Sequence, residues 1–397
     1  PKNAVSYFVS YYDYYQPEAY IPHTDTYIAK ETEINEEIDK LRLAATTNLL
    51  TRKDTIIVAS VSCIYNIGSP VEYGKFILEL KTGMKVVRDN ILSRLTDLQY
   101  ERNDYGFRRA TFRARGDSVE VFPAYEDTAV RIELLGDKIS TMHRVNPLTG
   151  NILERLNASV IYPAKHYMAD PSSFHDVFAK IRMDLDKRVE ELREKGKELE
   201  VQRLIQRVNY DLEMIQEIGY VNGIENYSRY FDGRKPGDPP YSLLDYFEAA
   251  NKEWFLIVDE SHITIPQIRG MYNGDRSRKK VLIEYGFRLP AALDNRPLRF
   301  DEFMRKVHQT VFMSATPNEW EFSLSGKENV AEQLIRPTGL VDPQVVVRST
   351  KGQIDDLMNE IQIRVKRGER ALVIILTKRM AEELSRFLEE KGVKVHY

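Results

Sequence analysis

Two short polar segments carry residue types that could act on phosphates. In LIVDESH, residues 256–262, an apolar run leads into the adjacent carboxylates Asp259 and Glu260, with His262 close behind. Asp259 is suited to hold Mg²⁺ through water, and Glu260 to orient a water that attacks a phosphate. The triplet Ser314-Ala315-Thr316 follows a second apolar run and adds two hydroxyls, from Ser314 and Thr316. For the Asp-Glu pair alone, a helix N-cap is the alternative explanation.

The two segments together are more specific than either one. Asp-Glu-x-His with Ser-Ala-Thr, each after an apolar run, resembles the pattern of superfamily 2 helicases, which use ATP and Mg²⁺. The hydroxyls would link the phosphate state to motion of a neighbouring domain. The sequence contains no G-x-x-x-x-G-K-[ST] motif to cradle phosphates. We therefore expect that this chain alone neither binds ATP tightly nor hydrolyses it. The sequence starts at Pro1 and stops at Tyr397, directly after the strand-like segment Val393–Val395, and we expect a chain cut from a longer one at both ends.

Apolar runs predict the strands that position these segments. They are Thr55–Ala59, Trp254–Val258, Thr310–Met313 and Ala371–Leu376. All four are apolar at odd and even positions, which favours strands buried on both faces of a parallel sheet, although a buried helical turn is possible for any one of them. Polar side chains follow each run, at the edge where open α/β sheets bind ligands.

Other parts of the chain have different patterns. Residues 76–165 contain alternating segments separated by RGDS and LLGD, which predict an antiparallel, half-exposed sheet. Residues 172–218 predict two charged amphipathic helices divided at Gly196. PGDPP at 236–240 and the segment 335–339 are predicted boundaries. Residues 353–397 are predicted to form helix, strand, helix and strand.

Residues 7–27, YFVSYYDYYQPEAYIPHTDTY, are crowded with aromatic side chains. Stacking on nucleic-acid bases is one explanation, because it contributes about 1–3 kcal/mol per base and needs no sequence code. A half-buried sheet edge or a protein-binding face explains the segment equally well. Asp13 and Glu18 lie among the rings and would repel phosphate, which favours a steric wedge over an electrostatic groove.

The bulk composition excludes several classes of protein. The chain has 397 residues, a net charge of −3 and a single cysteine, Cys63. It can form no internal disulfide, which fits a reducing compartment, and the scattered His residues give no metal-ligand spacing. No apolar run is long enough to span a membrane. The densest basic cluster is Arg276, Arg278, Lys279 and Lys280, which predicts either phosphate contacts or a solvated face.

Several segments resemble one family closely. YFVSYYDYYQPEAYIPHTDTYI, IIVASVSCIYNIGSP, GIENYSRYF, FLIVDESHITIPQIRGMYNGDRSRK, GFRLPAALDNRPL and LIRPTGLVDPQVVVR are similar to the UvrB family, which recognises damage in bacterial nucleotide excision repair. The resemblance implies a cytoplasmic protein without a membrane segment. It also implies that UvrA loads the protein on damaged double-stranded DNA, that ATP drives limited strand separation, and that UvrC is then recruited.

The resemblance also assigns roles to individual residues. The opening segment would be a β-hairpin that inserts between DNA strands. Its implied DNA-binding residues are Tyr11, Tyr12, Tyr14, Tyr15, Glu18, Tyr20 and Tyr27. The implied UvrA-binding residues lie in the predicted β-rich domain and are Arg102, Arg113, Arg115, Arg131 and Glu133. For Arg102–Arg115 an ordinary charged strand face is the alternative.

The expected fold class is α/β: a RecA-like helicase domain with an inserted hairpin, a helical subdomain and a small β-rich domain, plus the start of a second RecA-like domain. The expected parts are 1–75 with the hairpin at about 9–33, 76–165, 166–240, 241–335 and 336–397. Two rival functions are a scaffold that docks UvrA and DNA without ATPase activity, and a processive translocating helicase.

Overall fold

The computed structural model describes residues 3–166, 174–219, 221–334, 339 and 341–397. The chain is α/β, as predicted, and divides into two compact units, Pro1–Val330 and Ala331–Tyr397. Residues 335–338 of the predicted boundary 335–339, and residues 167–173 of the predicted helical subdomain 166–240, lie outside the described residues. None of the described helices is both long and apolar enough to cross a membrane.

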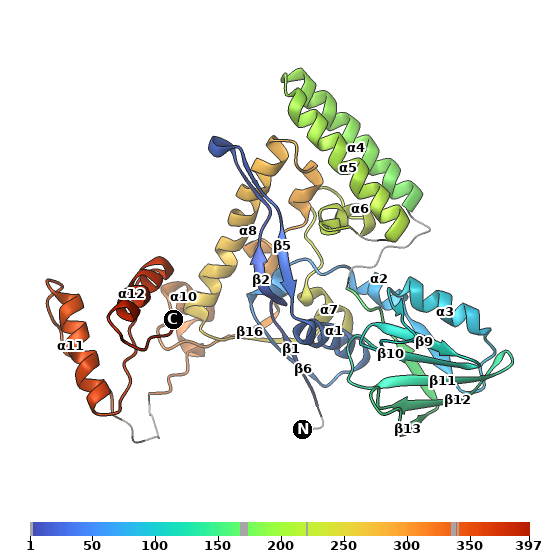
Figure 1. Cartoon of the computed structure of the whole chain (residues 1–397), viewed down its shortest axis with the longest axis horizontal. Helices are drawn as coiled ribbons and strands as arrows, with labels where there is room; N and C mark the ends of the chain where they lie inside the picture. Colours follow the sequence, from blue (N-terminus) through green and yellow to red (C-terminus); the bar gives the residue numbers. More distant parts are fainter. Residues whose placement is uncertain (1–2, 167–173, 220, 335–338, 340) are drawn as a thin grey trace. The chain divides into compact units, whose positions relative to one another are not determined.

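Two parallel strand pairs lie at the centre of the first unit. β1 (Ala4–Phe8) pairs with β6 (Thr55–Ala59), and β15 (Phe255–Val258) pairs with β16 (Gln309–Phe312). Helix α1 (Glu36–Thr51) connects the hairpin to β6 and lies against β1 (Figure 1). Phe8, Leu43, Leu49 and Tyr246 of α7 (Leu243–Ala250) are buried in one apolar core.

The strands are present, but they are covered on one face only, which corrects the prediction of two buried faces. Val5, Ile56 and Val58 are more than half exposed, and so are Phe255 and Ile257. Successive side chains of a strand alternate between faces, so helices packed on one face leave every second residue in solvent.

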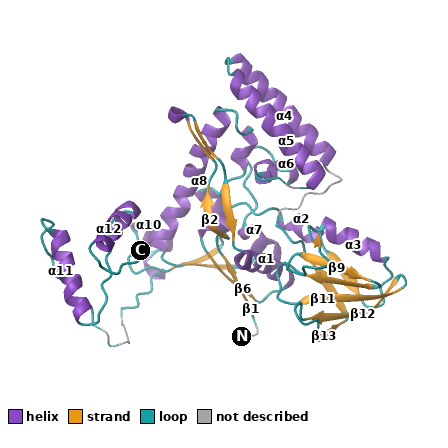
Figure 2. Cartoon of the chain, viewed as in Figure 1, coloured by secondary structure: helices purple, strands orange, loops and turns teal. Residues whose placement is uncertain are grey.

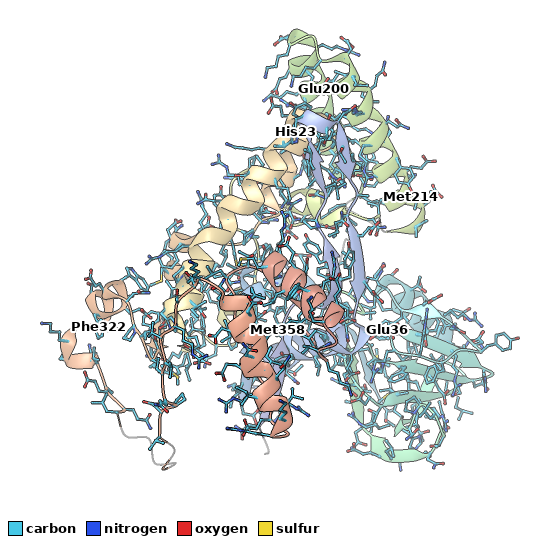
Figure 3. The ribbon with its side chains drawn as sticks, turned by 60° about the vertical axis from the view of Figure 1, so that its left-hand side comes forward. His23, Glu36, Glu200, Met214, Phe322 and Met358 are labelled. Carbon is cyan, nitrogen blue, oxygen red and sulfur yellow. The ribbon has the colours of Figure 1, made fainter. Side chains whose placement is uncertain are left out.

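The opening segment forms a long antiparallel hairpin. β2 (Tyr12–Gln16) pairs with β5 (Glu31–Ile34), and β3 (Ala19–Ile21) pairs with β4 (Thr26–Ile28). The short helix η1 (Pro22–Thr24) closes the hairpin, and Asp25 follows in the left-handed conformation. Figure 3 labels His23 at this tip and Glu36 at the start of α1, near the opposite end of the hairpin.

A β-rich part follows α2 (Pro70–Lys75). Its six-stranded sheet has the order β13-β12-β11-β10-β9-β8, and β7 (Leu78–Lys81) pairs with β14 (Ala158–Ile161) (Figure 2). Helix α3 (Arg88–Asp97) lies between β7 and β8 in the chain. The strands of the large sheet are β8 (Glu101–Arg102), β9 (Thr111–Arg115), β10 (Ser118–Phe122), β11 (Ala129–Leu135), β12 (Lys138–Val145) and β13 (Ile152–Leu156). RGDS and LLGD form the predicted turns, and β9 to β12 are antiparallel.

The remaining elements of this unit are mainly helical. α4 (Phe174–Glu194) and α5 (Glu198–Ile218) form the predicted hairpin, with Gly196 in the turn between them. α8 (Ser261–Glu284) begins directly after β15 and runs beside the Tyr-rich hairpin (Figure 1). The shorter elements are η2 (Val61–Ile64), η4 (Ile224–Tyr227), α6 (Ser228–Phe231), η5 (Pro290–Asp294), α9 (Phe300–Lys306), α10 (Glu319–Ser325) and η6 (Lys327–Asn329).

The second unit contains α11 (Gln353–Lys366) and α12 (Lys378–Glu390). The two predicted strands of this unit, Ala371–Leu376 and Val393–Val395, are not formed among its described residues. Leu372, Ile374 and Leu376 are almost fully exposed. A strand is held by hydrogen bonds to a neighbour, and the structure pairs neither segment with one, so the apolar pattern alone does not produce a strand there.

Candidate DNA-facing and nucleotide-facing sites

Three tyrosines stack at the base of the hairpin. The Tyr11 and Tyr12 ring centroids are 4.4 Å apart, and those of Tyr12 and Tyr15 are 4.9 Å apart, with nearly parallel planes. In a regular strand Tyr12 and Tyr14 would share a face, but the pairing with β5 shifts register between them. The shift allows Tyr12 and Tyr15 to stack, whereas Tyr14 is half exposed and donates its hydroxyl to Gln16.

A buried arginine supports the inner end of this stack. Arg42 projects from α1, and its guanidinium carbon lies 4.0 Å from the Phe8 ring centroid and 4.6 Å from that of Tyr11. It donates a hydrogen bond of 2.6 Å to the Val9 carbonyl oxygen. Burial, followed by the effect of the Tyr12 hydroxyl, raises the pKa of Tyr11, so this ring stays neutral. The stack is therefore fixed at Tyr11, and Tyr15, about half exposed, is its outer ring.

Asn35 connects the hairpin base to α1. Its side-chain oxygen accepts hydrogen bonds from the backbone N–H groups of Glu37 and Ile38, which caps the helix. Its amide nitrogen donates to the Asp13 carboxylate, and its backbone N–H donates to the Tyr11 carbonyl at 2.8 Å. Asp13 is thus held by Asn35.

The outer tyrosines contact the rest of the protein. Tyr27 stacks on Phe287 with centroids 4.7 Å apart, and Tyr20 lies 4.9 Å from both Phe287 and Tyr285. The Tyr20 hydroxyl donates to Asp25 at the tip. Tyr20 and Tyr27 therefore pack the outer hairpin against the segment that follows α8.

Glu18 lies in a buried ion-pair network and not on an open surface. Its carboxylate accepts the Arg288 Nε–H at 2.8 Å and the Tyr27 hydroxyl at 2.6 Å. Arg288 also pairs with the fully buried Asp211 of α5 at 3.3 Å. Burial, aided by the hydrogen bond to Glu18, raises the pKa of Tyr27 to about 12. The network joins the hairpin to the helical part of the chain.

The basic cluster at 276–280 has two members held inside the protein by hydrogen bonds and two members exposed to solvent. Lys279 is buried, pairs with Asp275 at 2.8 Å, and donates to the Asn295 carbonyl oxygen. Arg278 pairs with Asp275 and donates to the Glu18 carbonyl oxygen at 2.6 Å. Arg276 and Lys280 are exposed, so these two are the members of the cluster that present their charge to solvent.

The predicted phosphate-acting residues gather at the ends of β15 and β16. His262 Nδ1 lies 2.7 Å from the Ser314 hydroxyl and 3.5 Å from Glu260 Oε2. The Ser314 hydroxyl also accepts the backbone N–H of Thr316 at 3.0 Å. His262 thus connects the strand-end carboxylate to the Ser-Ala-Thr triplet, while Asp259, Glu260 and Thr316 are exposed.

Glu260 adopts an unusual backbone conformation. Its φ of +45° and ψ of +49° place it in the left-handed region, which costs a non-glycine residue on the order of 1 kcal/mol or more. The turn lets α8 begin at Ser261, whose backbone N–H donates to the Met313 carbonyl oxygen at 3.0 Å. The left-handed residue thus lies at the junction of β15 and α8. The adjacent carboxylates of Asp259 and Glu260 are exposed at this junction.

The donor set at this edge fits a hydrated magnesium ion and not a protein-enclosed metal. Mg²⁺ keeps most of its waters and takes one or two carboxylates together with nucleotide phosphates. Asp259 offers one exposed carboxylate of this kind. Among the described residues, no group of three or more His, Cys, Asp and Glu side chains could hold a metal.

Four of the five predicted partner-binding residues line one concave site of about 310 Å³ on the sheet. They are Arg113, Arg115, Arg131 and Glu133, together with Ser118 and Glu120. Arg131 Nε donates to Glu120 at 2.6 Å, and Arg113 bonds the other oxygen. Burial opposes ionisation of Glu120, but these two arginines outweigh it and lower its pKa. The fifth residue, Arg102, pairs with Asp104 outside this site.

Sequence reasoning missed the residues that hold the hairpin in place. The sequence around Arg42 did not indicate its role, because its stacking partners, Phe8 and Tyr11, belong to a different segment of the chain. Phe287 and Arg288 lie in the segment GFRLPAALDNRPL, which contributed to the family resemblance without receiving a role. Their contacts with Tyr27 and Glu18 join positions more than 250 residues apart.

Comparison with known proteins gives a consistent result. A family model of the UvrB interaction domain matches residues 78–167, and one of the UvrB third helical domain matches 172–233. Over its whole length the chain is 57% identical to UvrABC system protein B of Caldanaerobacter subterraneus subsp. tengcongensis and 55% identical to that of Synechococcus elongatus. It is also 55% identical to the Bifidobacterium longum protein of the same name. The chain spans 59%, 59% and 56% of these relatives, respectively.

Proposed function

The chain belongs to the UvrB family, and we propose that it serves UvrABC-type excision repair by checking DNA for damage with its Tyr-rich hairpin. The observation that carries this proposal is the supported stack of Tyr11, Tyr12 and Tyr15 at the hairpin base. A stack of rings that is fixed at one end and open at the other can receive a displaced base whatever the DNA sequence around it. Lesions differ chemically, so recognition without a sequence code suits this task.

The outer hairpin has a different role in this proposal. Tyr20, Tyr27 and Glu18 hold the hairpin against Phe287 and Arg288, so that it can separate two strands without bending. Of the residues assigned to DNA by the family resemblance, Tyr14 and Tyr15 would contact the nucleic acid. Tyr11 and Tyr12 would support the stack from its inner end, and the other three would act by positioning the hairpin.

Partners and nucleotide complete the proposal. The arginine-rich concave site of the β-rich part would dock UvrA, and the complex on DNA would recruit UvrC. Bound ATP with Mg²⁺ would supply the energy for limited strand separation. Asp259 would hold the hydrated ion, Glu260 would orient the attacking water, and His262 would connect Glu260 to Ser314.

Binding to damaged and undamaged DNA in the presence of UvrA tests the hairpin assignment. Alanine in place of Tyr11, Tyr12 or Tyr15 should reduce the preference for damaged DNA by roughly fivefold to a hundredfold, as expected for loss of 1–3 kcal/mol of stacking. Tyr210→Ala is a matched control, because Tyr210 is an exposed tyrosine on α5 outside the hairpin. An unchanged preference in all three variants would contradict the assignment.

A second candidate function is a docking scaffold without ATPase activity. The observation in its favour is that the sequence contains no Walker A motif. We expect this chain alone to show no ATP hydrolysis, and a version joined to a P-loop segment to gain hydrolysis that Glu260→Gln abolishes. If the P-loop segment restores nothing, the scaffold is favoured. Displacement of long duplexes would instead support a translocating helicase.

A further inference from the structure

One tyrosine outside the hairpin is completely exposed. Tyr105, in the turn between β8 and β9, has a side chain that is 100% accessible to solvent. Single exposed apolar side chains are common on protein surfaces and need no explanation by themselves. The turn that carries Tyr105, and the charges around it, are less ordinary.

Side chains of the turn itself fix its backbone. The Asn103 side-chain oxygen accepts the backbone N–H groups of Tyr105 at 3.2 Å and Gly106 at 2.7 Å. The backbone N–H of Asn103 donates to the Phe112 carbonyl oxygen at 2.8 Å. A Cβ added at Gly106 would lie 3.1 Å from the Asn103 amide nitrogen, so the turn closes tightly around that side chain. The backbone of Tyr105 is therefore held without any contribution from its ring.

Asp104 ties the same turn to the rest of the sheet. Its carboxylate accepts the backbone N–H of Ala114 at 3.1 Å and the Nε–H of Arg102 at 3.2 Å. Its carbonyl oxygen accepts Arg115 Nη2 at 3.1 Å. The hydrogen bond from Ala114, followed by the contact with Arg102, lowers the pKa of Asp104. Arg115 also lines the concave site, so Tyr105 adjoins that site through Asp104.

The charges of the β8–β9 turn and of the adjoining concave site are mixed in sign. Cations and anions are nearly equal in number: the cations are Arg102, Arg108, Arg113, Arg115 and Arg131, and the anions are Glu101, Asp104, Glu120 and Glu133. A surface that follows a phosphate backbone is dominated by cations. Tyrosine and arginine together, on a rigid support, are instead typical of the centre of a protein–protein interface.

We propose that Tyr105 is the aromatic anchor of the protein-docking face of the β-rich part. Its ring would enter an apolar pocket of the partner, and carboxylates at the rim of that pocket would pair with Arg102 and Arg115. Little conformational entropy is lost on binding, because the turn is already fixed. This inference rests on the proposed docking of UvrA to the same domain, and it adds a residue and a kind of pocket to it.

Titration of UvrA with this chain and its variants tests the anchor. Tyr105→Ala should weaken the complex at least about tenfold, as for a typical anchor residue, and Tyr105→Phe should stay within about threefold if the ring supplies the contact. Tyr210→Ala, at an exposed tyrosine of α5, should leave binding unchanged. The thermal midpoint of Tyr105→Ala should equal that of the parent chain, because the ring contributes no packing.

The outcomes separate this inference from the proposed function. If the parent chain does not bind UvrA, both are overturned. If the parent binds and Arg115→Ala weakens binding while Tyr105→Ala stays within twofold, the anchor alone is overturned. If Tyr105→Ala leaves UvrA binding intact but weakens binding to DNA, the ring belongs to a nucleic-acid surface and the anchor is again overturned.

Discussion

At the scale of single residues, contacts divide the hairpin tyrosines into two groups. Tyr15 and Tyr14 are about half exposed at the base, while Tyr20 and Tyr27 contact Phe287. Glu18 gives the clearest contrast with its predicted surroundings. An acidic residue among tyrosines was expected to repel phosphate, whereas its carboxylate is paired with Arg288 and shielded from solvent.

Glu302 should make stability depend on pH in acid. It is buried and accepts hydrogen bonds from Arg296 at 2.6 Å and Arg299 at 2.8 Å. Burial opposes its ionisation, but these bonds outweigh burial and lower its pKa from 4.5 to about 2. The folded-state pKa lies below the unfolded value, so this contribution is complete above about pH 5 and is lost as the pH falls toward 2. It amounts to about 3 kcal/mol.

Urea-induced unfolding of the parent and Glu302→Gln chains at pH 7 and pH 3 measures this contribution. The variant should be less stable at pH 7, and the difference should shrink at pH 3. Asp301→Asn is the matched control, because the neighbouring Asp301 is exposed and its ion pair with Arg305 is also exposed, and it should change stability by less than about 0.5 kcal/mol. An equal deficit for Glu302→Gln at both pH values would contradict the argument.

At the scale of elements, the sequence pattern predicted where the strands of the first unit lie but not which of their faces are buried. Thr55–Ala59 is a strand with the predicted bounds, and Asp259 and Ser314 follow neighbouring parallel strands. Local composition determines such features. Which face of a strand is covered depends on elements elsewhere in the chain, and for that reason the exposure of Ile56 and the absence of a strand at Ala371–Leu376 were not foreseen.

The contacts that hold the outer hairpin against the segment after α8 could not be predicted for a similar reason. In these contacts Phe287 packs on Tyr27 and Arg288 pairs with Glu18, although each pair is more than 250 residues apart in the sequence. No periodicity or spacing within one segment encodes such a contact. Tyr-rich composition indicated that rings would stack, but not that some would stack on each other and others on the body of the protein.

Gly286 should be essential to the close approach of the segment that follows α8 to helix α5. Its φ is +74°, and a Cβ built there would lie 2.3 Å from the backbone carbonyl oxygen of Glu200. Alanine would meet rigid backbone in a conformation that already disfavours it. We expect Gly286→Ala to lower the free energy of unfolding by more than about 2 kcal/mol, measured by urea-induced unfolding.

Gly196 provides the control for backbone strain without a clash. Its φ is +68°, and a Cβ there would meet no atom within 4 Å. Gly196→Ala should therefore cost only about 1 kcal/mol. If the two variants lost equal stability, the approach of Gly286 to Glu200 would not be a constraint on the fold.

At the scale of the whole chain, the first unit joins several parts through charged contacts. Helix α1 meets the β-rich part in a closed ring of four charges. Lys40, which is 9% exposed, pairs with Glu37 and lies 3.2 Å from Asp127. Arg109 bonds Asp127 and lies 3.6 Å from Glu37. The ring is one turn of α1 from Asn35, which holds the hairpin base, so the β-rich part and the hairpin are connected through α1.

Removing Asp127 should loosen this junction. Asp127→Ala leaves the buried ammonium of Lys40 with Glu37 as its remaining ring partner, at a cost of about 1–2 kcal/mol. Faster hydrogen exchange in the first two turns of α1 would report the loss, and 1 M salt should reduce the difference from the parent because charge pairing is screened. Asp54→Ala removes an exposed pair with Arg52 at the other end of α1 and should leave exchange in the first two turns of α1 unchanged. If both variants behaved alike, or if salt had no effect on Asp127→Ala, the ring would not be what holds the β-rich part to α1. The connection from the β-rich part to the hairpin would then have to run through apolar contacts such as those of Tyr73 and Tyr162.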